Sequence, residues 1–195
     1  MTTILDYEMG NLRSVEKAIE ALGEPVRIAT EIDGAERLIL PGVGAFGAAM
    51  ARLGPMREGL RAYVAAGKPL LGICLGQQLL FERSEEFGDH EGLGLLKGEV
   101  RYLPAGESRK IPLIGWSEVR IEDETLGRGL HSGDQLYFVH SLYTEAADPA
   151  DVALTAEYGI RFPAAVRREN VWGMQFHPEK SGDAGLRLLR NFLDS

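Results

Sequence analysis

The sequence has very little cysteine: Cys74 is the only one among 195 residues. A single cysteine excludes an intrachain disulfide and is typical of a protein from a reducing compartment. No apolar run approaches the roughly 20 residues that a membrane-spanning helix needs. The first twenty residues also lack the apolar core of a signal peptide, because charged residues are spread through them: Asp6, Glu8, Arg13, Glu16, Lys17 and Glu20. These absences predict a cytoplasmic protein.

Positive charge is also scarce. The 21 lysines and arginines are outnumbered by 29 acidic residues, which gives a formal net charge of −8 at pH 7. Such a balance disfavours binding to nucleic acids and to anionic membranes. The sequence has no internal repeat, low-complexity tract or linker, and a chain of this length buries roughly 70% of its unfolded surface. We therefore expect one domain over residues 1–195.

In the first half of the chain, short apolar strands alternate with amphipathic helices. Strands are expected at residues 3–5, 25–28, 37–40 and 69–74, and helices at 12–22, 45–53, 56–66 and from 75 onward. Alternation of this kind implies parallel strand pairing and a doubly wound α/β sheet. Ligands of such sheets bind outside the carboxyl ends of the strands.

The second half of the chain consists mostly of short strand-like runs separated by glycines, prolines and charges. They lie at residues 93–96, 99–103, 114–121, 136–140, 152–156, 164–168 and 171–176. We interpret them as an added antiparallel layer together with the last strands of the main, mostly parallel sheet. A closing helix is expected from about residue 183, because Leu186, Leu189 and Leu193 share one face.

Gly72-Ile73-Cys74-Leu75-Gly76 lies where an apolar strand gives way to a helical pattern. This is the spacing of a nucleophile elbow, with cysteine in place of serine. So sharp a turn needs glycine on either side, and it exposes its central residue at a helix N-terminus, which favours a thiolate. A lone cysteine is more often a small buried hydrophobic residue, but the flanking glycines favour a nucleophile here.

The segment Gly42-Val43-Gly44-Ala45-Phe46-Gly47 matches the G-x-G-x-x-G spacing of dinucleotide-binding proteins. The remainder of that pattern is missing, because no acidic strand end follows about twenty residues later and the motif lies on the third strand. We interpret the segment as a loop whose backbone N–H groups face a developing negative charge. The alternative is a tight strand-to-helix turn, which also needs glycines.

His177-Pro178-Glu179 is the second chemical motif. Pro178 favours an extended conformation at His177, so that the imidazole and the carboxylate two residues later can point to the same side. A Cys-His-Glu triad requires this arrangement, since the carboxylate orients the imidazole and the imidazole deprotonates the thiol. Seen alone, the motif would be a surface turn. The remaining histidines at 90, 131 and 140 lack metal-ligand spacing, so no metal site is predicted.

Together, these motifs resemble those of the class I glutamine amidotransferases. Further segments at residues 6–15, 40–44, 111–116, 137–141 and 176–181 are similar to the glutaminase subunits of imidazole glycerol phosphate synthases, from histidine biosynthesis. The resemblance runs from the first strand to the last helix and implies the flavodoxin-like class I amidotransferase fold. Glu8 stands where a small residue is expected, and Gln77 where methionine is common.

The resemblance implies that the chain hydrolyses glutamine through a thioester on Cys74, with His177 as base and Glu179 as its orienting acid. The oxyanion would be held by the N–H of Leu75 and by the loop of Gly42, Val43 and Gly44. Glutamine's amino-acid end would be held by Gln78, Glu86 and Ser141. No metal or organic cofactor is implied.

The resemblance also implies a partner, a (β/α)₈-barrel synthase that receives the ammonia. The residues expected at that interface are Asn11, Trp116, Tyr137 and Lys180. Two alternatives remain at this stage: the glutaminase of another synthesis, such as that of anthranilate or pyridoxal phosphate, and a non-catalytic regulatory partner that kept the fold.

Overall fold

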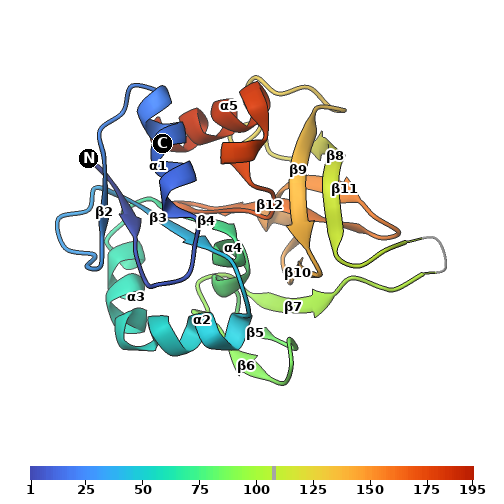
Figure 1. The fold of residues 1–195 in the computed structure, drawn as a ribbon, viewed down its shortest axis with the longest axis horizontal. Helices are drawn as coiled ribbons and strands as arrows, with labels where there is room; N and C mark the ends of the chain where they lie inside the picture. The colour runs from blue at the N-terminus through green and yellow to red at the C-terminus, as the bar shows by residue number, and fades with distance from the viewer. Residues whose placement is uncertain (107–108) are drawn as a thin grey trace.

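A nine-stranded mixed sheet runs through the molecule (Figure 1), and the structure, a computed structural model, describes residues 1–106 and 109–195. Its strand order is β2 (Val26–Ala29), β1 (Thr2–Leu5), β3 (Arg37–Gly42), β4 (Leu70–Cys74), β13 (Val171–Met174), β12 (Arg161–Arg168), β11 (Val152–Glu157), β8 (Leu113–Ile121) and β9 (Gln135–His140). The strands from β2 to β13 pair in parallel, and those from β13 to β9 pair antiparallel. The expected α/β fold is confirmed, and the antiparallel strands largely extend the main sheet.

Helices cover both faces of the parallel half, as the sequence pattern predicts. Figure 1 shows α1 (Leu12–Ala21) and α5 (Gly182–Leu193) on one face, and α2 (Phe46–Leu53) and α3 (Arg57–Ala65) on the other. The short helix α4 (Leu75–Leu79) packs on the same face as α2, and the 3₁₀ helix η1 (Gly54–Met56) joins α2 to α3. The helices α1, α2 and α5 each bury a stripe of side chains three and four residues apart, for example Val15, Ala18 and Ile19 of α1.

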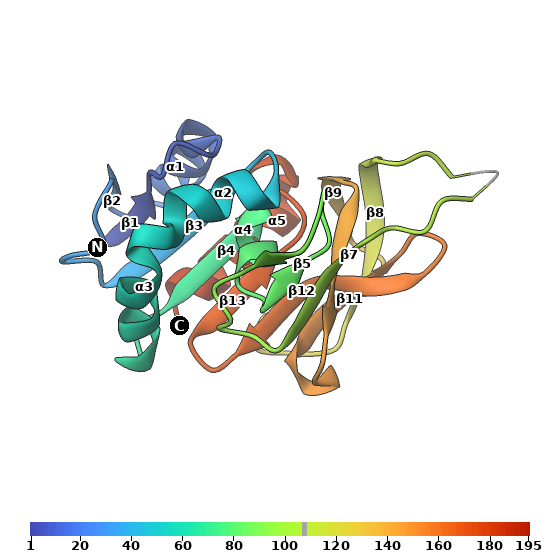
Figure 2. The same ribbon diagram turned by 90° about the horizontal axis from the view of Figure 1, so that it is seen from below.

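The added layer is a small four-stranded sheet beside the main one (Figure 2). Its order is β10 (Leu142–Ala146), β7 (Gly98–Tyr102), β5 (Arg83–Ser84) and β6 (His90–Glu91). Two further 3₁₀ helices are η2 (Pro149–Asp151) and η3 (Pro178–Lys180). Over the described residues, no helix combines the length and the apolar character that a membrane crossing requires.

The prediction of a strand at residues 93–96 is wrong. This apolar run is a loop that closes the end of α4, because the Leu93 N–H bonds the Leu79 carbonyl at 2.8 Å and the Leu95 and Leu96 N–H groups bond Leu80. Carbonyls at a helix C-terminus have no partner within the helix, and this loop supplies their donors. Leu93 and Leu96 are buried as the leucines of a strand would be, which is why the pattern misleads.

Candidate active site

Cys74 lies at the junction of β4 and α4, with backbone angles φ 55° and ψ −112°. A non-glycine residue with positive φ is strained, and such strain occurs mainly where it serves a site. The two flanking glycines are required by contact. A Cβ on Gly76 would lie 1.8 Å from the Leu40 carbonyl oxygen, and one on Gly72 would lie 2.4 Å from the Gly76 carbonyl oxygen. The predicted elbow turn is therefore present, but the expected exposure of its central residue is wrong, because Cys74 is buried with only 7% of its surface exposed.

The loop of residues 42–44 follows β3, the strand next to β4. Gly42 pairs in register with Cys74, and a Cβ on it would lie 2.5 Å from the buried hydroxyl of Tyr7. Gly44 has φ +103°, which glycine adopts readily. A Cβ on Gly47 would lie 2.7 Å from the ring of His90, so packing explains the third glycine of the motif.

His177 and Glu179 lie in the turn after β13, the strand that pairs with β4 on its other side. The Nδ1 atom of His177 lies 2.8 Å from Oε1 of Glu179, and both side chains are buried. The extended conformation expected before Pro178 is present, with φ −95° and ψ 98° at His177. The surface-turn alternative for this motif is thus excluded by burial.

Two opposing effects act on the His177 imidazole. Burial lowers the pKa of His177, but hydrogen bonds with Cys74 and Glu179, and the negative charges of both, outweigh it and raise the pKa from 6.5 to about 9. A raised imidazole pKa means that the ring readily takes and holds a proton beside the sulfur. The arrangement is an imidazole that binds its proton tightly, placed near the sulfur of the only cysteine in the chain and backed by a buried carboxylate.

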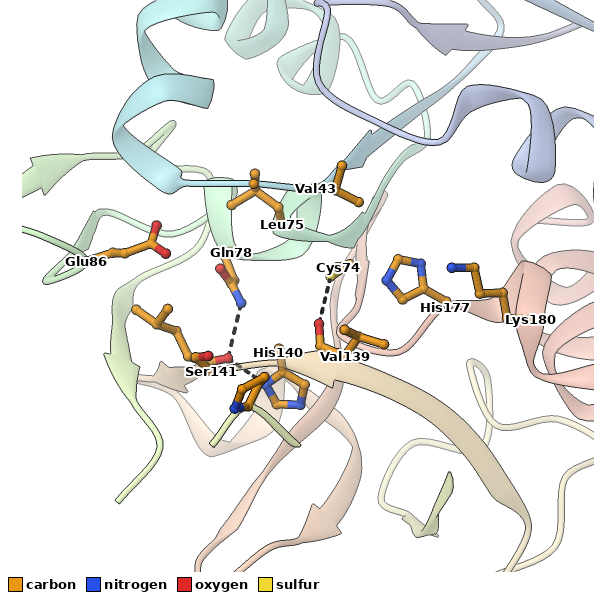
Figure 3. Close-up of a pocket in the computed structure, with 13 residues that line it drawn as sticks. Val43, Cys74, Leu75, Gln78, Glu86, Val139, His140, Ser141, His177 and Lys180 are labelled. Carbon is orange, nitrogen blue, oxygen red and sulfur yellow. Dashed lines mark hydrogen bonds between the residues drawn. The ribbon is translucent and has the colours of Figure 1, made fainter. Parts of the chain in front are cut away.

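A cavity of about 350 Å³ opens at this point, outside the carboxyl ends of β3 and β4. It is lined by Val43, Gly44, Cys74, Leu75, Gln78, Glu86, Pro112, Val139, His140, Ser141, Leu142, His177 and Lys180. Figure 3 shows Cys74 and His177 in the middle, Lys180 beside His177, and Gln78 and Glu86 on the opposite side. The volume lies within the range of small-molecule binding sites.

The three residues expected to hold glutamine all line this cavity. The side-chain amide of Gln78 donates to the Leu142 carbonyl at 3.2 Å and to Oε1 of Gln175 at 3.0 Å, which fixes its orientation. The Glu86 carboxylate accepts the Phe46 N–H at the start of α2. Of the expected oxyanion residues, Val43, Gly44 and Leu75 line the cavity, whereas Gly42 lies behind them against Tyr7.

The four residues expected at the partner interface are not equally close to the cavity. Lys180 lines it. Trp116 is 53% exposed and packs edge-to-face on Tyr137, with ring centroids 5.8 Å apart. Asn11 is exposed at the start of α1, in a surface depression that Asp6 and Arg13 also line.

Sequence reasoning missed two polar residues of this region, Gln175 beside Cys74 and His140 in the wall of the cavity. The Gln175 side-chain amide lies 3.9 Å from the Cys74 sulfur, and the Val139 carbonyl lies at the same distance. His140 donates from Nδ1 to the Leu142 carbonyl, at 2.7 Å, and burial lowers its pKa to about 4. The available signal was strand alternation, since His140 follows Leu136 and Phe138 on the buried face of β9.

Known proteins that are similar in sequence to this chain indicate one family. The model of the family "Glutamine amidotransferase class-I" matches residues 3–195. The imidazole glycerol phosphate synthase subunit HisH of Rhodopirellula baltica is 51% identical over 98% of this chain and 96% of its own. That of Syntrophotalea carbinolica is 47% identical over the full length of both chains.

Two solved structures share the fold. A glutamine amidotransferase structure has a TM-score of 0.77 at 22% identity, covering 99% of this chain and 97% of its own. PurLQS from Thermotoga maritima has a TM-score of 0.75 at 22% identity, with the same coverage. The elbow, the fold and the full-length similarity to HisH subunits lead to one assignment. The chain belongs to the class I glutamine amidotransferase family, on the branch of the HisH subunits of imidazole glycerol phosphate synthase.

Proposed function

We propose that this chain is a single glutaminase domain, spanning residues 1–195, that supplies ammonia to a synthase of histidine biosynthesis in the cytoplasm. The observation that carries the proposal is the placement of Cys74 at a strained elbow, in one cavity with a His177 whose Nδ1 atom lies 2.8 Å from Glu179. The net reaction converts glutamine and water to glutamate and ammonia.

The first half-reaction forms a thioester. His177 takes the thiol proton, and the Cys74 thiolate attacks the side-chain amide carbon of glutamine. The carbon–nitrogen bond then breaks as His177 returns the proton to the departing ammonia. Because the pKa of His177 is about 9, the ring holds its proton at neutral pH and is ready to act as the acid.

Negative charge on the tetrahedral intermediate is stabilised by backbone donors. The Leu75 N–H and an N–H of the Gly42-Val43-Gly44 loop are the proposed pair, and one such donor is typically worth about 2.7–4 kcal/mol. Water then attacks the thioester carbon, His177 removes its proton, and glutamate leaves as the thiol is restored. Gln78, Glu86 and Ser141 hold the amino-acid end of the substrate during both steps.

The proposed partner is a (β/α)₈-barrel synthase. The similar proteins are named as subunits of a synthase, which supports the existence of a partner chain. Ammonia released at His177 passes toward the face that carries Lys180, Trp116 and Tyr137, with Asn11 at its margin. There the synthase would use it to form imidazole glycerol phosphate and an aminoimidazole carboxamide ribotide. A sealed face is needed because ammonia protonates readily in water.

The test is glutamate release from glutamine, measured with the co-expressed barrel synthase and with the chain alone. We expect hydrolysis that the synthase stimulates, and formation of imidazole glycerol phosphate. Stimulation by an anthranilate or pyridoxal phosphate synthase instead would assign the chain to another pathway. No hydrolysis under any condition would favour a regulatory role.

A further inference from the structure

The hydrogen bonds of the Ser181 hydroxyl are unusual for its position in the chain. It occupies the N-cap position of α5, where a serine hydroxyl normally accepts an N–H of its own helix, yet its side chain makes no such bond. Its Oγ atom instead donates to the His177 carbonyl at 2.7 Å and accepts the Tyr137 N–H at 3.0 Å. The side chain is buried, so both bonds are shielded from water.

These bonds connect two parts of the candidate active site that come from distant segments. Tyr137 belongs to β9, the strand whose end lines the cavity through Val139 and continues to Ser141. The Tyr137 carbonyl also accepts the His177 N–H at 2.9 Å. Both backbone groups of Tyr137 are therefore engaged by the turn that carries His177, and one of the two connections depends on a single hydroxyl.

The position of β9 makes this connection important. β9 is the last strand of the nine-stranded sheet and pairs with β8 on one side only. On its other side, the His177–Ser181 turn takes the place of a neighbouring strand at Tyr137. Without the Ser181 hydroxyl, the edge would be held to that turn at this point by one backbone hydrogen bond.

We propose that Ser181 is a positioning residue, which sets the distance between the imidazole of His177 and the substrate-lining end of β9. This inference rests on the proposed glutaminase function, because it concerns the same cavity. The hydroxyl touches neither substrate nor sulfur, and it acts by fixing the backbone at His177 relative to Tyr137. Transfer of a proton between imidazole and leaving group tolerates little displacement, so a small shift costs rate rather than binding.

The experiment replaces Ser181 in the complex with the barrel synthase. For Ser181→Ala we expect kcat for glutamine hydrolysis to fall about 10- to 100-fold, the scale for a misplaced catalytic group. KM should stay within about twofold because the groups that hold glutamine are unchanged. Ser181→Cys keeps the size of the side chain but bonds weakly, and it should lose kcat in the same way even if Ser181→Ala folds poorly.

Thr155→Val is the matched control. Thr155 is also buried and its hydroxyl also bonds two groups, Glu122 and Arg161, and none of the three residues lines the cavity. This variant should lower the melting temperature and leave kcat unchanged, which separates loss of stability from loss of positioning. A kcat for both Ser181 variants within twofold of the unchanged protein would overturn the proposal.

A second readout does not depend on glutaminase activity. Cys74 is the only cysteine in the unchanged chain, so its alkylation by iodoacetamide reports the thiolate that His177 maintains. We expect slower alkylation in Ser181→Ala and an unchanged rate in Thr155→Val. If the complex hydrolyses no glutamine, the proposed function fails, and the alkylation rate alone then tests the role of Ser181. An alkylation rate in Ser181→Ala equal to that of the unchanged protein would overturn the positioning role.

Discussion

Gly42 and Cys74 are register partners at the carboxyl ends of two adjacent parallel strands. Because Gly42 has no side chain, the proposed oxyanion loop and the proposed nucleophile meet with only backbone between them. The space that a Cβ would take is filled by the Tyr7 hydroxyl, at 2.5 Å, and by the first turn of α4. The packing at this junction therefore leaves no room for a Cβ on Gly42, and the same holds for Gly72 and Gly76 of the elbow.

Gly76→Ala is expected to be severely destabilising. Its Cβ would lie 1.8 Å from the Leu40 carbonyl oxygen, so the backbone of α4 or β3 must move. We expect a loss of about 4 kcal/mol in the free energy of unfolding, the scale of exceptional single substitutions. Gly54→Ala is the control, because Gly54 has helical angles and nothing within 4 Å of its Cβ position. It should be neutral or gain about 0.4–1 kcal/mol, measured by urea unfolding.

Cys74 variants should separate chemistry from strain. Cys74→Ala is expected to abolish glutamine hydrolysis while the complex still makes product from added ammonium salts, because only ammonia production is lost. Cys74→Gly should be equally inactive but more stable than Cys74→Ala by about 1 kcal/mol, since glycine relieves the strain of φ 55°. Substantial glutamate release from either variant would contradict the nucleophile assignment, and thermal unfolding measures the stability difference.

His177 and Glu179 should contribute unequally. His177→Ala removes the base and is expected to cost far more kcat than Glu179→Ala, which leaves an imidazole that still samples the productive pose. Equal losses would contradict these roles. Steady-state glutamate release in the complex measures both.

The pH dependence follows from the pKa of His177. Its folded-state value of about 9 lies above the ordinary 6.5, so kcat should decline as the pH rises through about 9, when the acid that protonates ammonia is lost. The same sign applies to folding: the protonated ring's extra stability is fully present below pH 6.5 and is lost as the pH rises through about 9. In Glu179→Gln the carboxylate charge is absent, and the alkaline decline should move to lower pH. An unmoved pH–rate profile would show that Glu179 does not act on the imidazole.

Lys180→Ala tests the partner face. Lys180 is exposed, lines the cavity and donates its backbone N–H to the His177 carbonyl at 3.0 Å. A displacement of Lys180 by a partner would therefore also displace the backbone of His177. We expect weaker stimulation of glutamine hydrolysis by synthase ligands and a smaller fraction of ammonia captured in product. Lys97→Ala, on an exposed lysine before β7, is the control. If both quantities match those of the control, Lys180 is a solvated surface charge worth about 0–1 kcal/mol.

The parts of the fold that the sequence predicts are those encoded over a few neighbouring residues. The elbow around Cys74 and the turn at His177-Pro178-Glu179 depend on local spacing and on proline, so both were recognisable before any tertiary contact was known. The strand–helix alternation of the first half is equally local. Their side-by-side placement was predictable only through the family resemblance.

What could not be predicted depends on distant contacts. Leu93–Leu96 has the composition of a strand but closes a helix, and Leu142–Ala146 forms β10 only by pairing with β7 some forty residues away. The contact of the Gln175 amide with the Cys74 sulfur is likewise a tertiary effect. An amide within an apolar strand pattern shows no local sign that it will lie beside a sulfur, whereas the burial of His140 follows from strand alternation.

The place of β13 between β4 and β12 has a consequence for synthesis of the chain on the ribosome. The strand β4, which leads to Cys74, is synthesised early. Its neighbour β13 is made about a hundred residues later, and His177 follows β13. Until then β4 has an open edge with unpaired backbone groups, and the nascent chain carries a thiol with no imidazole to activate it. Under the proposed mechanism, Cys74 therefore cannot act on glutamine until His177 has been synthesised and β13 has paired with β4, so the order of translation delays catalysis until the sheet is complete.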